Sequence, residues 1–457
     1  MKKTTFAVML DSYLKIGMKI ENNFDAVRRE VKYKGKNGVL YFLSTLTSSV
    51  QIMGIIESLV NVDITKYVSK EIYVGPISYD DDYKNILKLC LSGVACLILD
   101  DYDKAIMIET REYPTRSISE PTTEKTIRGS KDGFNESINT NIGLIRRRIR
   151  DKNLTIDLFS IGKKSKTDVA LIYLDDCVDE KIKNEIKLKL NNIDVDSLVM
   201  SDRALEEIIF KQNKSLFPLV RYTERPDVAS IELYQGKMII MVDTSASVII
   251  TPTTIFDHVH HVEEYRESPF AGTFLRLIRN LAIILSIFLI PLWLALVTET
   301  DINNYFILKP SKETAIPIIV QILLAELFME MIRIAIVHTP SELTSAISMV
   351  SAIILGSVSI KLEIFLPEIL VYVSFETIAS FATPSYELSN ANKLTKYYLL
   401  FLTALFGRVG FLIGTTIFIC YLSSVNILGI PYLYPIVPFD IRKAGSLFFR
   451  RKGNKTL

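Results

Sequence analysis

The apolar and polar residues of this chain are distributed unevenly, and their pattern divides it near Ser268. Residues 1–267 alternate short apolar runs with many Lys, Asp, Glu and Asn residues, which is typical of a water-soluble α/β region. From Leu281 onward the apolar runs are long and contain few charges, as membrane-spanning helices do. We therefore predict a multi-domain membrane protein, with an N-terminal cytosolic α/β region of two related subdomains and a C-terminal polytopic α-helical transmembrane bundle.

The soluble region contains the same succession of elements twice. Buried strands are predicted at residues 39–43 and 169–173, and a helix follows each of them, at 51–59 and 180–190. Later in each copy a glycine leads an apolar strand that an aspartate closes, and a second strand follows as a hairpin. The hairpins comprise residues 93–100 with 105–108 and residues 236–243 with 247–250. Two related subdomains explain this match, and the alternative is a chance likeness of generic strands.

The pattern divides the chain into six segments. They are an N-terminal amphipathic segment (1–29), a first α/β subdomain (30–115), a polar linker with an arginine-rich helix (116–150), a second α/β subdomain with the pre-membrane segment (151–267), a transmembrane domain (268–439) and a basic cytosolic tail (440–457). Asp11 and Lys15 interrupt the apolar residues near the N-terminus before a signal-peptide core is complete. We therefore expect the first half of the chain to be cytosolic.

The apolar runs of the C-terminal half predict four full spans with re-entrant segments, or six spans. The runs are residues 281–298, 314–337, 341–360, 364–381 and 396–425, followed by a short proline-containing run at 427–439. Arg276 and Arg279 precede the first run, and basic residues fill the tail, so the positive-inside rule places both ends in the cytosol. Two cytosolic ends require an even number of crossings.

Charged residues inside the predicted spans are the most informative positions. Glu326, Glu330 and Arg333 are spaced i, i+4 and i+7, so they share one helical face. The remaining intramembrane charges are Glu368, Glu376 and Arg408. Each such charge costs about 2.5–3.5 kcal/mol at the centre of a spanning helix, so these side chains must face protein or water. Two interpretations remain open: a polar pathway for ions, or a structural lock in which Glu330 pairs with Arg333 or with Arg408.

Composition excludes several classes of function. The net charge of +2, with no stretch that has the basic excess phosphate binding needs, argues against nucleic-acid binding. The four cysteines form no Cys-x-x-Cys pair, which argues against structural zinc and a disulfide framework. No phosphate-binding or dinucleotide-binding motif is complete, so we expect no enzyme and no cofactor. A histidine-rich stretch at 258–264 has residue types that ligate metals, but an interfacial helix before the first span explains it better.

Four arginines in five positions mark the helix predicted at residues 141–150. They are Arg146, Arg147, Arg148 and Arg150. Such a cluster binds anionic lipid or an acidic partner surface. The alternative is a solvated helix face whose charges are balanced by nearby acids.

The linker resembles the signature of the A-subunit family of spore germinant receptors, the GerA family. The resemblance lies in residues 120–129, 132–136 and 141–149, and the stretches 270–276 and 384–388 fit the same family. Its residues include Glu124, Arg128, Gly129, Gly133, Phe134, Arg146, Arg147 and Arg148. Residues 243–247 and 261–266 favour a branch other than the receptor A subunits, whose pre-span segment usually has a proline-containing apolar run and paired tyrosines.

The resemblance implies a role in the germination of bacterial endospores, at the spore inner membrane. Family members are thought to form ring-shaped oligomers that conduct ions when germination is triggered. The implied partners are membrane lipid, further copies of the chain and other inner-membrane germination proteins. A receptor A subunit and a non-conducting scaffold remain alternatives. A secondary transporter would need inverted repeats in the membrane half, and the sequence shows none.

Overall fold

The computed structural model describes residues 5–33, 36–61, 76–100, 102–113, 124, 126, 129–212, 215–297, 310, 316–338 and 341–449. The chain forms two compact units. The first comprises the residues up to 215 together with 219–253, and the second comprises 216–218 together with 254–452.

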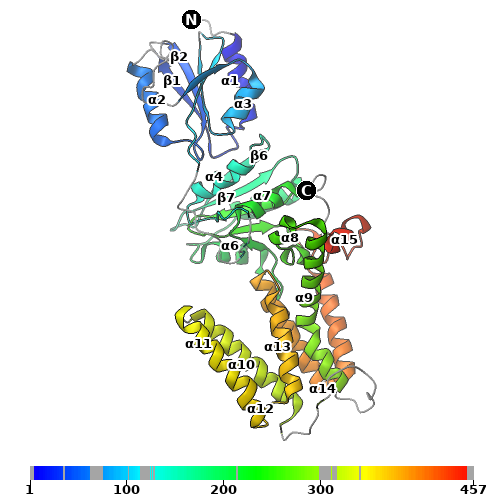
Figure 1. Ribbon diagram of the computed structural model, residues 1–457. Coiled ribbons are helices and arrows are strands. Elements are labelled where there is room, and N and C mark those ends of the chain that lie inside the picture. Colours follow the sequence, from blue (N-terminus) through cyan, green and yellow to red (C-terminus); the bar gives the residue numbers. More distant parts are fainter. Residues whose placement is uncertain are drawn as a thin grey trace. The chain divides into compact units, whose positions relative to one another are not determined.

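The first unit begins with a five-stranded antiparallel sheet of order β1-β2-β4-β5-β3 (Figure 1). Its strands are β1 (Ala26–Tyr33), β2 (Lys36–Leu43), β3 (Ile77–Asp80), β4 (Ala95–Leu99) and β5 (Ala105–Ile108). Strands β1 and β3 therefore form its two edges. Strand β4 is apolar at every position because both faces of the sheet are covered.

Helices cover both faces of this first sheet (Figure 1). Cys96 and Ile98 of β4 pack with α1 (Thr5–Gly17) and α3 (Tyr83–Cys90). The alternate residue Leu97 packs with α2 (Ser49–Asn61) on the opposite face, as the two-residue period of a strand requires. Helix α1, which the sequence pattern sets apart in segment 1–29, thus belongs to the core of the first subdomain.

A second sheet repeats the strand order of the first, as β6-β7-β9-β10-β8. Its strands are β6 (Leu154–Ile161), β7 (Thr167–Leu174), β8 (Arg221–Thr223), β9 (Met238–Val242) and β10 (Val248–Thr251). The predicted hairpins are confirmed: β4 pairs with β5 and β9 pairs with β10, both antiparallel. The identical order shows that the repeat in the sequence reflects two copies of one topology.

Helices flank the second sheet in a corresponding way (Figure 1). One face carries α4 (Ile138–Arg148) and α7 (Pro226–Tyr234), whose apolar residues share a core with β7 and β9. Helix α5 (Glu180–Asn191) packs on β6, and α6 (Ser201–Phe210) packs on β9 and β10. The N-terminus of α5 is capped by Asp179, whose carboxylate accepts hydrogen bonds from the backbone N–H groups of Lys181 and Ile182.

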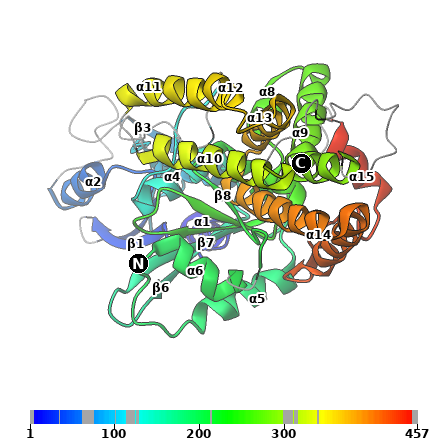
Figure 2. The same cartoon turned by 90° about the horizontal axis from the view of Figure 1, so that it is seen from below.

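The second unit is mainly helical. In chain order it contains η3 (Ile255–His258), α8 (Val262–Arg266), α9 (Pro269–Val297), α10 (Ile318–His338), α11 (Ser341–Ala352), the π-helical η4 (Ile353–Val358), α12 (Ser359–Lys361), α13 (Pro367–Phe381), α14 (Tyr386–Ser424), the short strands β11 (Asn426–Ile427) and β12 (Ile430–Pro431), and α15 (Ile441–Phe448). Helix α9 packs against α13 and α14, while α10 packs against α11 and α13 (Figures 1 and 2). The short proline-containing run at 427–439 forms part of the β11–β12 hairpin and the turns that follow it.

Two of the described helices are long and apolar enough to cross a membrane. They are α9, with a mean hydropathy of 2.5 over its most apolar window, and α14, with 1.8. Their outer surfaces carry many large apolar side chains, including Phe274, Leu281, Phe401 and Ile417. Exposed apolar surface of this extent suits lipid rather than water.

Candidate functional site

Three helices of the second unit bring opposite charges together in a buried position. The ammonium of Lys396 on α14 donates to Glu326 Oε2 on α10 at 2.7 Å and lies 2.9 Å from Glu376 Oε2 on α13. The side chains of Lys396, Glu376 and Glu326 are only 1%, 2% and 6% exposed. We call these three residues the inner triad. One cation thus joins two carboxylates from two other helices.

A second set of charges lies one helical turn away and is more exposed. Glu330 of α10 accepts a hydrogen bond from Lys393 Nζ of α14 at 3.0 Å and forms an ion pair with Arg333 of its own helix. These three side chains, the outer triad, are between 14% and 31% exposed. The Arg333 guanidinium also lies 5.8 Å from the ring centroid of Tyr386.

Helical spacing explains how the two triads are positioned. Glu326 and Glu330 are four residues apart on α10, and Lys393 and Lys396 are three residues apart on α14, so each pair occupies one helical face. The order of partners is reversed between the helices, since the earlier glutamate meets the later lysine. Two facing stripes of opposite charge are therefore in register.

The structure brings together four of the six charges that the sequence singled out within the spans. Glu326, Glu330, Arg333 and Glu376 belong to the two triads. The pairing of Glu330 with Arg333, which one interpretation required, is present. Glu368 is half-buried in the first turn of α13, outside both triads.

Arg408 is half-buried in the second half of α14, directly after Gly407. Gly407 has φ 59° and ψ −138°, so the helix is interrupted there. Arg408 also lies outside both triads.

Sequence reasoning missed the two lysines. Lys396 is the first residue of the apolar run 396–425, where a lysine ordinarily reaches the interface, and Lys393 precedes that run. A signal was available in the i, i+3 spacing of the two cations, which matches the acidic face of α10. The position of the partner helix in space was required to recognise it.

Another buried ion cluster lies at the start of α9. The Arg276 Nε donates to Glu264 Oε2 at 2.7 Å, and Arg279 forms an ion pair with the same carboxylate. The glutamate thereby compensates part of the positive charge that precedes the first predicted span. Within the described ranges, no three His, Cys, Asp or Glu side chains are grouped as metal ligands would be.

The linker residues that carry the family resemblance include Glu124, which binds the second subdomain through hydrogen bonds. Buried Glu124 accepts a hydrogen bond from Arg221 Nη2 at 3.2 Å and another from the Thr223 hydroxyl. Arg225 donates to the carbonyl oxygen of Glu124 at 3.1 Å and to that of Ser130 at 2.9 Å. Two arginines and one threonine of the second subdomain therefore hold the linker in place.

The remaining linker residues have backbone and packing roles. Gly129 has φ +110°, which is strained for residues with a side chain. Gly133 is buried, and Phe134 enters the core of the second subdomain while its N–H donates to Glu224 O at 2.8 Å. Arg128 lies outside the described residues.

The interpretation of the arginine-rich helix must be corrected, because two of its arginines form ion pairs with other residues of the chain. Arg146 is 1% exposed and donates through Nε and Nη2 to both oxygens of Asp25, at 3.0 and 2.8 Å. Arg148 pairs with Asp132 at 2.5 Å. Arg147 is exposed, and its guanidinium lies 5.3 Å from the Tyr113 ring centroid. Neither a lipid-binding patch nor a solvated face describes Arg146, which joins the second subdomain to the first.

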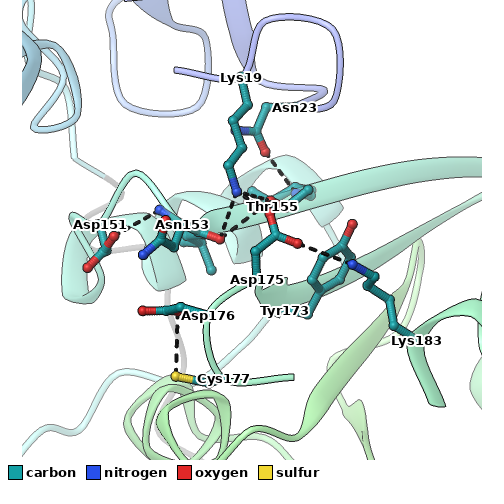
Figure 3. Close-up of polar contacts among 12 residues, drawn as sticks. Lys19, Asn23, Asp151, Asn153, Thr155, Tyr173, Asp175, Asp176, Cys177 and Lys183 are labelled. Carbon is teal, nitrogen blue, oxygen red and sulfur yellow. Dashed lines mark hydrogen bonds and ion pairs between the residues drawn. The ribbon is translucent and has the colours of Figure 1, made fainter. Parts of the chain in front are cut away.

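A polar cluster beside this ion pair continues the contact between the subdomains (Figure 3). Lys19 donates to the Thr155 hydroxyl at 2.9 Å and forms an ion pair with Asp175. Asn23 Oδ1 accepts from the Ile156 N–H at 2.8 Å. Burial raises the pKa of Asp175, but hydrogen bonds from Lys19 and Thr155 outweigh burial and hold this pKa below its ordinary value.

Comparison with known proteins shows similarity along nearly the whole chain. The profile of the Bacillus/Clostridium GerA spore germination protein family matches residues 14–456. Stage V sporulation protein AF of Bacillus subtilis is 39% identical over 94% of this chain and 89% of its own length. Spore germination protein KA of the same organism is 28% identical over 94% of this chain and 82% of its own length.

A solved structure is also similar. The N-terminal domain of the A subunit of the Bacillus megaterium spore germinant receptor GerK3 is 26% identical. The match covers 53% of this chain and 92% of that domain, with a TM-score of 0.40.

Proposed function

The chain belongs to the GerA family of Bacillus/Clostridium spore germination proteins, and from this premise we propose that it is a subunit of a homo-oligomeric ion channel in the spore inner membrane. The channel releases ions during germination. In this proposal the helical unit is a polytopic bundle, and the soluble unit is cytosolic and controls its opening. The partners are further copies of this chain, membrane lipid and other germination proteins of the same membrane.

The observation that carries this proposal is the pair of charged triads among α10, α13 and α14. Ionisable side chains between membrane helices are costly, and they ordinarily mark ion pathways, proton relays or interhelical locks. Glu330 and Arg333 of the outer triad are partly exposed on α10, whose other exposed positions include the apolar Leu327 and Met331. A partly exposed carboxylate among apolar side chains supports a polar, ion-accessible surface.

Flux measurements test the proposal. The full chain is reconstituted in liposomes loaded with potassium, and release is recorded for wild type and for Glu330→Gln, which removes a charge and keeps the shape. We expect wild type to release ions and Glu330→Gln to change the rate or the selectivity at least tenfold. Glu387→Gln, on α14 outside both triads, is the matched control and should behave as wild type. Intact, correctly inserted wild-type protein without any ion release refutes conduction.

Two alternatives rest on specific observations. Similarity to spore germination protein KA supports a germinant-receptor A subunit, which would act with other receptor subunits and not alone. The Glu330–Arg333–Lys393 contacts support a lock within a non-conducting scaffold. In the lock, Glu330→Gln would lower the amount of folded protein, because two cations would lose their anion. Protein abundance measured beside ion flux separates the lock from the channel.

A further inference from the structure

The inner triad contains one more negative than positive group. Glu326 and Glu376 each contribute a carboxylate, whereas Lys396 contributes the only ammonium among the three. All three side chains are more than nine-tenths buried. A buried net charge is energetically unfavourable. The inner triad lacks one positive charge for neutrality. One bound monovalent cation makes the triad neutral, whereas a divalent ion would reverse the imbalance.

The same two carboxylates have oxygen atoms without a protein donor. Both glutamates direct Oε2 to the Lys396 ammonium. Their Oε1 atoms are buried, and among the described residues no donor reaches either one. The nearby Tyr397 hydroxyl lies 3.5 Å from Glu326 Oε2, the atom that already accepts from Lys396. Two buried acceptors in a site that lacks one positive charge mark a position for a proton.

The outer triad carries the opposite net charge to the inner triad. Lys393 and Arg333 together exceed Glu330 by one positive charge, one helical turn from the inner triad. The outer triad is more exposed than the inner triad, so water screens part of this excess positive charge.

We propose that the inner triad is a binding site for one proton, shared between the carboxylates of Glu326 and Glu376 beside Lys396. On binding, one carboxylate oxygen takes a proton from a hydronium ion: an O–H bond forms on the carboxyl group, an O–H bond of the hydronium breaks, and a water molecule leaves. The protonated carboxyl no longer pairs with the ammonium as an anion. Lys396 therefore binds the helix of the ionised glutamate more strongly than the helix of the protonated glutamate. Proton binding is thereby coupled to the packing of α10, α13 and α14.

The ligand set favours a proton over a dehydrated sodium or potassium ion. An alkali ion stripped of water needs several oxygen ligands, and the triad offers few oxygens beyond those already bound to Lys396. A proton needs a single carboxylate oxygen. Either ion would supply the missing charge, so the experiment must distinguish them.

Infrared difference spectroscopy of the full chain in detergent micelles tests the site. Wild type should show a carboxylic-acid C=O band that disappears at alkaline pH and corresponds to one carboxyl group per chain. Glu376→Gln and Glu326→Gln should each lose this band, because either change leaves one balanced carboxylate–ammonium pair. Glu387→Gln should retain it. The two variants are independent, so the test survives the misfolding of one of them.

Three results overturn the proposal. If wild type shows no carboxylic-acid band that changes with pH, the triad binds no proton, and the spectra of the variants do not alter this conclusion. A band that persists in both glutamine variants belongs to other residues. Loss of the band when sodium or potassium replaces choline at constant pH identifies an alkali ion as the occupant.

The binding measurement does not depend on ion flux, although a role of the proton in gating rests on the proposed function. A chain that binds the proton but releases no ions refutes the channel and leaves the site intact. A chain that conducts without a titrating band refutes the site and leaves the channel intact.

Discussion

Arg146 and Asp25 form a fully buried ion pair between the two α/β subdomains, at 1% and 0% side-chain exposure. We expect Arg146→Ala to lower the free energy of unfolding by about 3–5 kcal/mol, because it leaves the Asp25 carboxylate buried without its partner. Denaturant unfolding of the full chain in detergent measures this loss. Arg147→Ala, on the exposed neighbour, should change stability by less than about 0.5 kcal/mol.

A double variant separates charge from packing at this position. Asp25→Leu combined with Arg146→Met removes both charges, and we expect it to recover most of the lost stability. Equal effects of Arg146→Ala and Arg147→Ala would contradict the role given to the pair. The sequence identified the arginine cluster, but only the fold could show that a residue 121 positions away neutralises one member.

Asp175 gives the contact between the subdomains a dependence on pH. Its folded pKa lies below the unfolded value, so its ion pair with Lys19 stabilises the protein above the unfolded value of about 4 and is lost as pH falls through the folded pKa. We expect wild type to lose thermal stability in that acidic range more steeply than Asp175→Asn. Thermal unfolding midpoints across pH provide the measurement.

The neighbouring Asp176 supplies the matched control for this titration. It is exposed and directed away from Lys19 (Figure 3). Asp176→Asn should therefore keep the wild-type pH profile. If both variants follow the same profile, the Lys19–Asp175 contact contributes nothing to acid stability.

At the scale of an element, Gly407 interrupts α14 and so determines the relative direction of its two halves. Its backbone has φ 59° and ψ −138°, and a methyl group there would meet nothing within 4 Å. The penalty of Gly407→Ala is therefore one of backbone conformation, about 1–3 kcal/mol. We expect a lower thermal midpoint in detergent, or a straightened α14 seen as altered cross-linking between its two halves.

Gly356 is the control, because its substitution also meets open space but its φ is not in the left-handed region. Gly356→Ala should be neutral or slightly stabilising. If the two alanine variants behave alike, the break at Gly407 is not a requirement of the folded protein.

The elements themselves were largely predictable from the sequence. Strands β2, β4, β7 and β9 and helices α2 and α5 occur where apolar runs and helical periods placed them, because their burial pattern is written locally. Short or edge elements such as β8, with three residues, carry too little pattern to be recognised. The proline-containing run at 427–439 forms a hairpin and turns, a conformation that its apolar composition alone does not predict.

The charged site was predictable only in part. The shared face of Glu326, Glu330 and Arg333 follows from helical spacing alone. Which cation meets each acid depends on how α10, α13 and α14 pack, and helix packing is not encoded in any one helix. The two lysines that complete the triads could therefore not be assigned from the sequence.

At the scale of the whole molecule, the charge pattern predicts that both ends of the chain are cytosolic. Native Cys177 is exposed and probes the soluble unit, and Lys443→Cys probes the tail, in a background where exposed Cys420 is replaced by Ser. We expect an impermeant thiol reagent to label neither site in intact cells and both after permeabilisation. Buried Cys90 and Cys96 remain unlabelled in the folded protein. Labelling of the tail alone in intact cells would require an odd number of crossings.

The edge of the first sheet has a consequence for chains crowded in a membrane. Strand β1 is an outer strand, and its exposed positions carry Arg29, Glu30 and Lys32. Molecules that diffuse in one plane with similar orientation meet edge to edge far more often than molecules in solution. Bulky charges along an edge oppose strand addition, so they protect a dense population of this protein from polymerising into a continuous sheet.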